Sequence, residues 1–194
     1  MKKSKIKEAL ATSIKLKQRL SFFRSFTSSR IHGYVLDFTD DFALIHQTDD
    51  FHLDGFAIVP LKTIKKVRHS EFEDMYEYIM KKENYLDELG IHYSIDLTNW
   101  QTIFKSIEEN EKFVIIECEQ LWIGRFLLGK LTKAKKKKVE MLYLEANGVF
   151  DEYVTQQKYK EITIVRFDEI YINLFQKYAR YKNQVLPKLV IDNQ

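Results

Sequence analysis

Six lysines within nine residues form the strongest local concentration of charge in the chain. Residues with strand character flank the run on both sides, so we expect it to form the tip of a β-hairpin. Such a tip can neutralise several phosphates of a nucleic acid, or it can be a solvated tip that keeps a sheet edge from aggregating. The candidate polyanion-binding residues are Lys130, Lys133, Lys135, Lys136, Lys137 and Lys138.

The segment from Gly124 to Lys130 (GRFLLGK) has the spacing of a phosphate-binding loop up to its last position. Leu131 stands where such a loop carries the Ser or Thr that holds magnesium. The residues between the glycines are bulky and apolar, whereas a phosphate cradle needs uncrowded backbone amides. We therefore predict no nucleotide site here and no bound cofactor.

A second polar segment, HQTDDFH, holds His46, Asp49, Asp50 and His52. Imidazole and carboxylate groups are ligands of zinc and other divalent metals. Aspartates in a tight turn also bond to their own backbone, which explains the same residues without a metal. The turn interpretation is favoured, and no metal site is predicted.

Cys118 is the single cysteine, so neither a disulfide within the chain nor a cysteine-based zinc site can form. The neighbouring Glu117 and Glu119 raise the pKa of its thiol, which is the opposite of what a nucleophile needs. We predict a buried structural cysteine. The sequence holds no Gly-x-Ser-x-Gly or His-Glu-x-x-His motif, so the chain is not predicted to be an enzyme.

Charge is unevenly distributed although the net charge of the 194 residues is only +3. The first 30 residues carry nine lysines and arginines against the single acid Glu8, while residues 71–119 are rich in Asp and Glu. The basic end can meet an anionic partner or pair with the acidic middle of the chain. Its cations break the N-terminal sequence before an apolar run long enough for an export signal develops. No window of the chain approaches 18 uninterrupted apolar residues, so no membrane span is expected. Together with the single cysteine, this predicts a cytoplasmic protein.

The hydrophobic pattern alternates as in strands over residues 30–68 and then changes to helical spacing. Ser70 and Glu73 predict a capped helix ending near Gly90. Its expected buried face is Phe72, Met75, Tyr76, Ile79, Met80 and Leu86. A shorter helix is predicted from Thr98, with Gln101 completing its cap.

Strand character returns at residues 113–118, 121–128 and 139–144, and a final helix is expected from about Asp168. The apolar stripe of this last helix is Phe167, Ile170, Tyr171, Leu174, Phe175, Tyr178 and Tyr181. We interpret the stripe as core packing.

The two parts of the chain show a weak internal repeat. Residues 63–68 (TIKKVR) match residues 162–166 (ITIVR), and each segment is followed by an acidic helix start. Further upstream, the pattern pairs Gly33 with Gly124, and the turn ending at Gly55 with Asn147 and Gly148.

Three segments of the first part, HGYVLDF, FALI and VPLKTIKKV, resemble small Sm-like or SH3-like barrels over residues 30–68, and residues 121–167 do so more loosely. The resemblance implies a fold of five short, bent strands. RNA-binding Sm proteins are similar in carrying an Asn in the turn that here reads DFTDD, so their RNA-binding residues cannot be carried over.

These patterns predict an α+β fold with two small antiparallel, barrel-like β units, each followed by an amphipathic helix. We place the basic N-terminal segment, the first unit and its helix in residues 1–90, and the short helix, the second unit and the C-terminal helix in residues 91–194. This division requires two separate sheets.

The hypothesis for function is a non-enzymatic protein-binding or adaptor module. The alternative is nucleic-acid binding, of RNA in particular, through the basic N-terminus and the 130–138 lysine hairpin, and a small hydrolase is the third reading. The sequence does not determine the oligomeric state.

Overall fold

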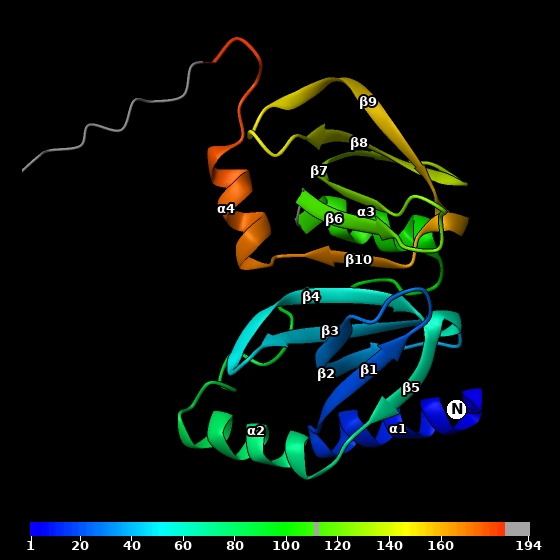
Figure 1. Ribbon diagram of the computed structural model, residues 1–194, viewed down its shortest axis with the longest axis vertical. Helices are drawn as coiled ribbons and strands as arrows, with labels where there is room; N and C mark the ends of the chain where they lie inside the picture. The colour runs from blue at the N-terminus through cyan, green and yellow to red at the C-terminus, as the bar shows by residue number, and fades with distance from the viewer. Residues whose placement is uncertain (111–112, 185–194) are drawn as a thin grey trace, which may run out of the picture.

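The computed structural model describes residues 1–110 and 113–184, and its ten strands in this part of the chain form one antiparallel sheet (Figure 1). The strands are β1 (Arg19–Arg24), β2 (Arg30–Phe38), β3 (Phe42–Asp49), β4 (His52–Pro60), β5 (Ile64–Arg68), β6 (Phe113–Cys118), β7 (Arg125–Ala134), β8 (Lys138–Leu144), β9 (Phe150–Lys158) and β10 (Ile164–Phe167). The helices are α1 (Lys3–Leu16), α2 (Glu71–Lys82), α3 (Trp100–Asn110) and α4 (Ile170–Tyr178), with single 3-10 turns η1 (Leu61–Thr63) and η2 (Tyr159–Glu161).

The strand order is β5-β1-β2-β3-β4-β10-β6-β7-β8-β9, so the prediction of two separate sheets is wrong. Strand β10 pairs with β6 on one side and with β4 on the other, which joins the two parts of the chain into one continuous sheet. Within the described ranges no pairing closes either set of five strands into a barrel. The α+β class is confirmed.

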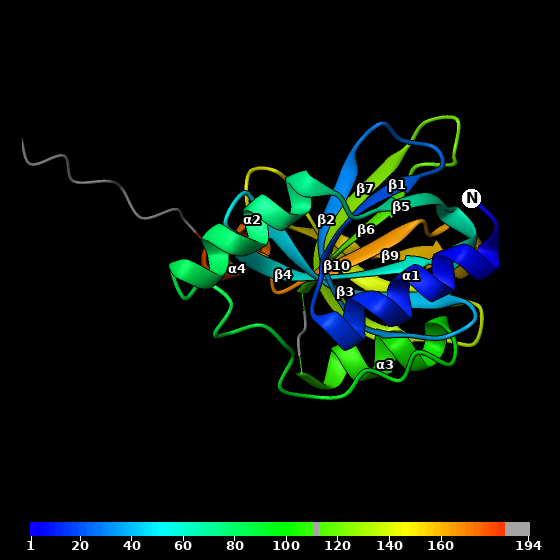
Figure 2. The same cartoon turned by 90° about the horizontal axis from the view of Figure 1, so that it is seen from below.

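The two parts of the sheet nevertheless have the same order of elements. We call residues 3–82 the first half and residues 100–178 the second half. In each half a helix precedes four strands, a 3-10 turn, a closing strand and a second helix. The helix α1 packs on β2 as α3 packs on β7, and α2 packs on β1 as α4 packs on β6. Figures 1 and 2 show α2 and α4 on the same side of the molecule.

A glycine in the second strand of each half marks the corresponding positions. Gly33 in β2 lies opposite Gln47, and a Cβ atom at Gly33 would lie 2.2 Å from the carbonyl oxygen of His46. Gly129 in β7 has the same close contact, at 2.1 Å, with the carbonyl oxygen of Leu142. Gly33 therefore corresponds to Gly129, and the pairing with Gly124 expected from sequence is wrong.

A β-bulge follows each of these glycines at the same distance along the strand. The register shifts between Val35 and Asp37 in β2 and between Leu131 and Lys133 in β7. Bulges increase the local bend and twist of a strand, so both halves curve at the same place. The β3–β4 turn, which contains Asp50, corresponds to the β8–β9 turn, which contains Gly148, and both residues have positive φ. The first of these turns ends before β4 begins at His52, and not at Gly55 as expected.

The largest buried cluster crosses the junction of the two halves. Phe56 of β4 stacks on Phe167 of β10 with ring centroids 5.3 Å apart, and the apolar face of α3 covers both strands. This face is formed by Trp100, Ile103, Phe104 and Ile107, as the sequence predicts. The cap of α3 differs from the prediction, because the Asn99 side chain accepts hydrogen bonds from the amides of Gln101 and Thr102.

The buried face of helix α2 differs in part from the prediction. Met80 is buried as predicted, but Glu73 and Glu77 are buried as well, and Phe72 and Met75 are exposed. The two carboxylates meet hydrogen-bond donors beneath the helix: the Arg19 backbone amide donates to Glu77, and the Ser21 hydroxyl and the Arg68 guanidinium donate to Glu73. The helix also ends at Lys82 rather than near Gly90.

Helix α4 likewise exposes most of its predicted stripe. Ile172 is its fully buried residue and Phe175 packs beside it, whereas Ile170, Tyr171, Leu174 and Tyr178 are exposed. Apolar spacing predicted that α2 and α4 are helices but did not predict which face each of them buries.

We expect Gly33→Ala and Gly129→Ala each to destabilise the fold by about 2 to 3 kcal/mol, because the added methyl group has to displace backbone atoms. Gly124→Ala is the matched control, since nothing lies within 4 Å of its Cβ position. The measurement is the free energy of unfolding in urea, and an unchanged value for either buried glycine would contradict the assigned close contact.

Candidate functional site

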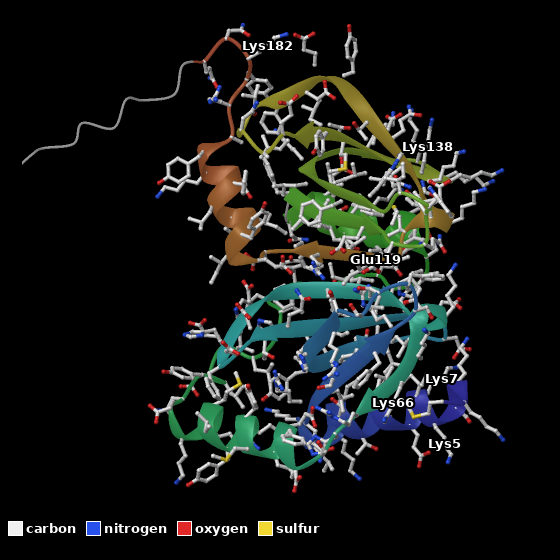
Figure 3. The ribbon with its side chains drawn as sticks, viewed as in Figure 1. Lys5, Lys7, Lys66, Glu119, Lys138 and Lys182 are labelled. Carbon is white, nitrogen blue, oxygen red and sulfur yellow. The ribbon has the colours of Figure 1, made fainter. Side chains whose placement is uncertain are left out.

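The junction between the halves holds a buried set of ion pairs. The Arg24 guanidinium donates two hydrogen bonds, of 2.7 and 2.8 Å, to the carboxylate of Glu119. Glu119 lies between the halves in Figure 3. Arg166 of β10 pairs with Glu117 at 2.6 Å and lies 3.5 Å from Glu169. The Arg24–Glu119 pair crosses from the first half to the second, whereas both contacts of Arg166 lie within the second half. Buried ion pairs give orientation more than net stability, so the Arg24–Glu119 pair helps to fix how the halves meet.

Glu169 has an unusual proton affinity at this junction. Burial raises the pKa of its carboxyl group to about 7, and Arg166 and the Gln47 amide, whose nitrogen donates at 2.5 Å, offset only part of that effect. His46 lies on the neighbouring strand β3, and burial lowers its pKa to about 4.

A cavity of about 560 Å³ opens on the other side of the same junction. We call it the junction cleft. Its walls come from the end of β4 and η1 in the first half, and from η2, the β7–β8 turn and the N-terminus of α3 in the second half. The lining residues are Asp41, Phe42, Pro60, Lys62, Thr98, Asn99, Trp100, Gln101, Lys136, Tyr159 and Lys160.

Three cations from three different segments line the junction cleft. Lys62 belongs to η1, Lys160 to η2, and Lys136 to the turn between β7 and β8. Each ammonium group is on an exposed residue, and no ion pair of the described chain involves any of the three. Lys62 and Lys160 occupy corresponding positions in the two halves, so the pairing of β4 with β10 brings these equivalent lysines to one cavity.

The cleft also has an aromatic floor with one unsatisfied polar group. Phe42 and Trp100 meet edge to face with centroids 4.8 Å apart, and Tyr159 stacks on Phe104. Tyr159 is only 8% exposed, yet its hydroxyl oxygen has no hydrogen-bond partner in the described chain. Burial raises the pKa of Tyr159 to about 12, so the group stays protonated and can both donate and accept a hydrogen bond.

Two hydrogen bonds hold the β7–β8 turn against the cleft. The Tyr159 amide donates to the Lys137 carbonyl at 3.2 Å, and the Gln101 side chain donates to the Ala134 carbonyl at 3.3 Å. Asp41 is the one carboxylate among the lining residues. A carboxylate repels phosphate but accepts hydrogen bonds from the amino groups of bases.

The structure separates the six lysines that the sequence groups together. Lys136 lines the cleft, and Lys137 is exposed beside it. Lys135 pairs with Glu140 at 2.5 Å, and Lys138 donates to Gln156 on β9 at 2.5 Å. The remaining two residues, Lys130 and Lys133, lie along β7, away from the turn. One of the six therefore reaches the candidate site.

The basic N-terminal segment does not extend this site. Lys7 pairs with Asp40, and Arg24 is buried in its pair with Glu119 of the acidic middle segment. Figure 3 shows Lys5 and Lys7 on the first half and Lys138 on the second. Internal pairing, which the charge distribution allows, thus uses part of the basic segment.

The other sequence motifs take structural positions. Gly124 directly precedes β7, whose extended backbone provides no phosphate cradle. No group of three or more His, Cys, Asp or Glu side chains is placed to hold a metal ion in residues 1–110 and 113–184. Cys118 is fully buried, and burial raises the pKa of its thiol to about 12. No helix in the same ranges is long and apolar enough to cross a membrane.

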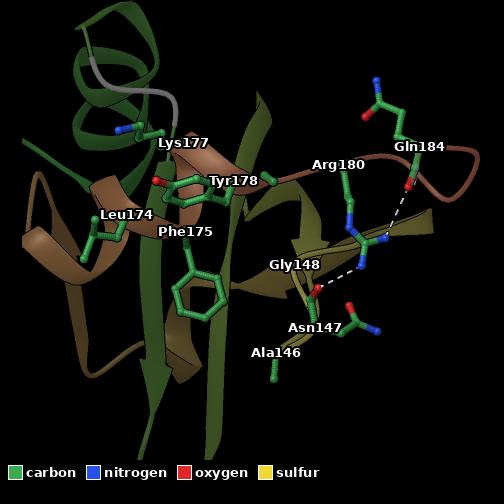
Figure 4. Close-up of a pocket in the computed structure, with 10 residues that line it drawn as sticks. Ala146, Asn147, Gly148, Leu174, Phe175, Lys177, Tyr178, Arg180 and Gln184 are labelled. Carbon is green, nitrogen blue, oxygen red and sulfur yellow. Dashed lines mark hydrogen bonds between the residues drawn. The ribbon is translucent and has the colours of Figure 1, made fainter. Parts of the chain in front are cut away.

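A larger cavity, of about 780 Å³, lies between α4 and the β8–β9 turn (Figure 4). Arg180 spans it by donating to the carbonyl oxygens of Asn147 and Gln184. Phe175 and Leu174 make its wall mainly apolar. Gln184 is the last described residue, so the outer boundary of this cavity is undefined and the junction cleft is the better candidate.

Comparison of the chain with protein-family models, with curated proteins and with solved structures finds no match. The geometry of the chain itself is therefore the basis for any functional conclusion.

We expect the free energy of unfolding of Glu169→Gln to rise relative to that of the wild type as pH rises from about 4.5 to about 7. The folded state binds the Glu169 proton more tightly than the unfolded state does, so ionisation destabilises the fold across this window. The gain is on the order of 2 kcal/mol between acid and neutral pH. The measurement is urea unfolding of both proteins at a series of pH values.

The comparison between variants is needed because His46 titrates over part of the same range with the opposite effect on stability. Exchange of the exposed Glu88 for Gln is the control. A difference between wild type and Glu169→Gln that does not change with pH would show that the carboxyl group titrates normally.

Proposed function

We propose that the protein binds single-stranded nucleic acid, with one nucleotide seated in the junction cleft. The observation that carries this proposal is the meeting of three lysines without ion pairs and an aromatic floor in one cavity of about 560 Å³. Binding modules for single strands combine cations that contact phosphates with aromatic side chains that contact bases.

The arrangement favours a flexible strand over a duplex. Lys62 and Lys160 flank the cleft from the two halves, while Lys136 and the exposed Lys137 extend the positive charge along the β7–β8 turn. A base can enter the cleft only when it is not stacked in a helix. Inside the cleft, Asn99 and Gln101 offer polar groups to the edge of the base. The backbone phosphates then lie near the lysines at the rim.

The two halves themselves support this proposal through their likeness to each other. We infer that they are duplicated modules similar to Sm-like barrels, because the glycines, bulges and helices correspond in position. Under this inference the cleft forms where two modules meet and requires both of them. The cations differ from those expected from sequence, since Lys62 and Lys160 lie outside the lysine run.

The protein-binding hypothesis stays a prediction. Its premise of two separate sheets is wrong, but the exposed apolar side chains of α2 and α4 are the kind of surface that a protein partner covers. The structure does not show what covers them, so the cleft carries the stronger proposal. The hydrolase reading has no support from the geometry of the cleft, which holds no paired nucleophile and base among its lining residues.

We expect binding of a labelled single-stranded RNA of about ten nucleotides to weaken steeply with salt. Each phosphate contact contributes about 0.7 to the slope of log K against log salt concentration for single strands. Joint exchange of Lys62, Lys136 and Lys160 for Gln should therefore reduce the slope by about 2. The measurement is fluorescence anisotropy at several salt concentrations.

The control is a triple exchange of Lys5, Lys81 and Lys82 for Gln, which removes the same charge at distant exposed positions. An equal loss of slope in both triple variants would assign binding to general charge and overturn the role of the cleft. Absence of binding by the wild-type protein to RNA and to single-stranded DNA would overturn the proposal itself.

Tyr159→Phe tests the buried hydroxyl group separately from the ring, which this exchange keeps. Its hydroxyl group makes no hydrogen bond in the described chain, so its removal should leave stability unchanged or slightly higher. If the hydroxyl binds the nucleotide, affinity should fall about fivefold, the effect of one lost hydrogen bond. Unchanged affinity together with unchanged stability would exclude the Tyr159 hydroxyl, but not its ring, from the binding site.

A further inference from the structure

A cluster of polar and charged side chains fills the space between α2 and the sheet of the first half. We call this cluster the α2 seam. Strands β1, β2 and β3 supply four of its members and helix α2 supplies two. The members are Arg19, Ser21, His32, Thr48, Glu73 and Glu77, and all except the half-buried His32 are buried.

The second half has the same space and fills it with apolar side chains. The glycine registers place Phe113 at the position of Arg19, Ile115 at Ser21, Leu128 at His32 and Leu144 at Thr48. These four residues pack with Phe150 and with Ile172 of α4 in one buried hydrophobic cluster. An apolar filling is therefore compatible with this backbone frame.

This difference indicates that the charges of the α2 seam are not there for stability. Replacing buried ion pairs by apolar residues of similar volume is often neutral or stabilising. Buried polar groups in a cavity wall are also a feature of ligand sites. The contacts within the seam show which of its groups remain available to a ligand.

Glu73 is fully committed inside the protein. Its carboxylate accepts hydrogen bonds from Ser21 at 2.6 Å, from Arg68 at 2.7 Å and from Ser70 at 2.7 Å. Burial alone would raise its pKa, but these donors lower it to about 2. The carboxylate is ionised at neutral pH and acts as the internal anchor of the seam.

The hydrogen bond from the Ser21 hydroxyl to Glu73 determines which ring nitrogen of His32 carries the proton. The Ser21 hydroxyl has a single hydrogen and donates it to Glu73, so its 2.8 Å contact with His32 requires the Nδ1 of His32 to be the donor. Burial and the nearby Arg19 lower the pKa of His32, which favours the neutral ring. The Nε2 atom is then an acceptor, and no hydrogen bond to it is found in the described chain.

Arg19 is the cation of the α2 seam, and it is only 4% exposed. Its Nε donates to the Thr48 hydroxyl at 2.9 Å, and its guanidinium lies over the Tyr76 ring at 4.5 Å. Neither of its terminal nitrogens has a hydrogen-bond partner among the described residues. Burial lowers its pKa, as expected for a charge that lacks full compensation.

A cavity of about 410 Å³ opens at these groups. Arg19, Arg30 and Arg68 line it, together with His32 and the rings of Phe72 and Tyr76. Three carboxylates line it as well: Glu73, which is bound to Arg68, Asp49 at the end of β3, and Asp50 in the turn that follows. The cavity wall thus combines guanidinium groups, carboxylates and aromatic rings.

We propose that the α2 seam binds a small phosphate-bearing ligand of the nucleoside monophosphate class. The phosphate lies against Arg19 and Arg30, whose planar guanidinium groups suit phosphate oxygens. The base lies against Phe72, which is exposed beside the cavity, and hydroxyl or amino groups donate to His32 and to the two aspartates. This site is separate from the junction cleft and involves none of its residues.

The test is isothermal titration calorimetry of the full chain with adenosine monophosphate, with inorganic phosphate and adenosine as separate probes. We expect saturable binding of the nucleotide that is weaker for either fragment. Arg30→Gln changes an exposed residue and should weaken nucleotide binding about tenfold, the loss of one charge-assisted contact. The lysine triple variant of the junction cleft is the control and should bind the nucleotide as the wild type does.

A second variant exchanges the seam for its counterparts of the second half, with Arg19→Phe, Ser21→Ile, His32→Leu and Thr48→Leu together with Glu73→Ile. Loss of nucleotide binding in a protein that still unfolds cooperatively would support the proposal. No saturable binding by the wild type at millimolar nucleotide would overturn it, as would equal binding by wild type and Arg30→Gln. Retained binding of RNA by Arg30→Gln would show that the two sites are independent.

Discussion

The pairing of β10 with two strands at once is the interaction on which the rest of the structure depends. A strand at the edge of a sheet presents unpaired amides and carbonyls, and β10 satisfies such groups on both β4 and β6. The same pairing stacks Phe167 on Phe56 and brings η2 beside the end of β4. Without it the two halves would have separate cores, and the junction cleft would not exist.

The two halves show how one backbone frame supports different chemistry. Close approach of the chain at Gly33 and Gly129, followed by a bulge, sets the curvature of both. Within that frame the second half has an apolar seam under α4, and the first half has charges under α2. The frame determines which positions face each other, and the residues at those positions determine whether the space is filled or left open to a ligand.

Charge in this protein is mostly used internally, which changes how the basic segments are interpreted. Arg24, Lys7 and Lys135 are each bound to a carboxylate of the chain, although they lie in the segments with the greatest excess of cations. The free cations that converge, Lys62 and Lys160, come from short turns that the charge pattern does not emphasise. Clustering along the chain is therefore a poor measure of the charge available at one place in space.

The sequence by itself determined most of the local elements. Alternating apolar residues and turn residues predict β2 to β6, β8 and β10, helical spacing predicts α2, α3 and α4, and the apolar surroundings of Cys118 predict its burial. A strand is also predicted at residues 121–128, but β7 spans Arg125–Ala134. Three elements were not predicted. The basic residues of α1 and β1 mask their apolar positions, and the polar sequence of β9, FDEYVTQQK, carries little strand pattern.

Only the tertiary structure decided how these elements face and join. Helical spacing cannot show that Glu73 and Glu77 turn inward, because that depends on the backbone amide of Arg19 in β1 and on the side chain of Arg68 in β5. It also cannot show that β10 joins both halves, because hydrogen bonding between distant strands leaves no periodic trace in either one. Local patterns record what each residue prefers, whereas the cleft and the seam depend on which residues the long-range pairing brings together.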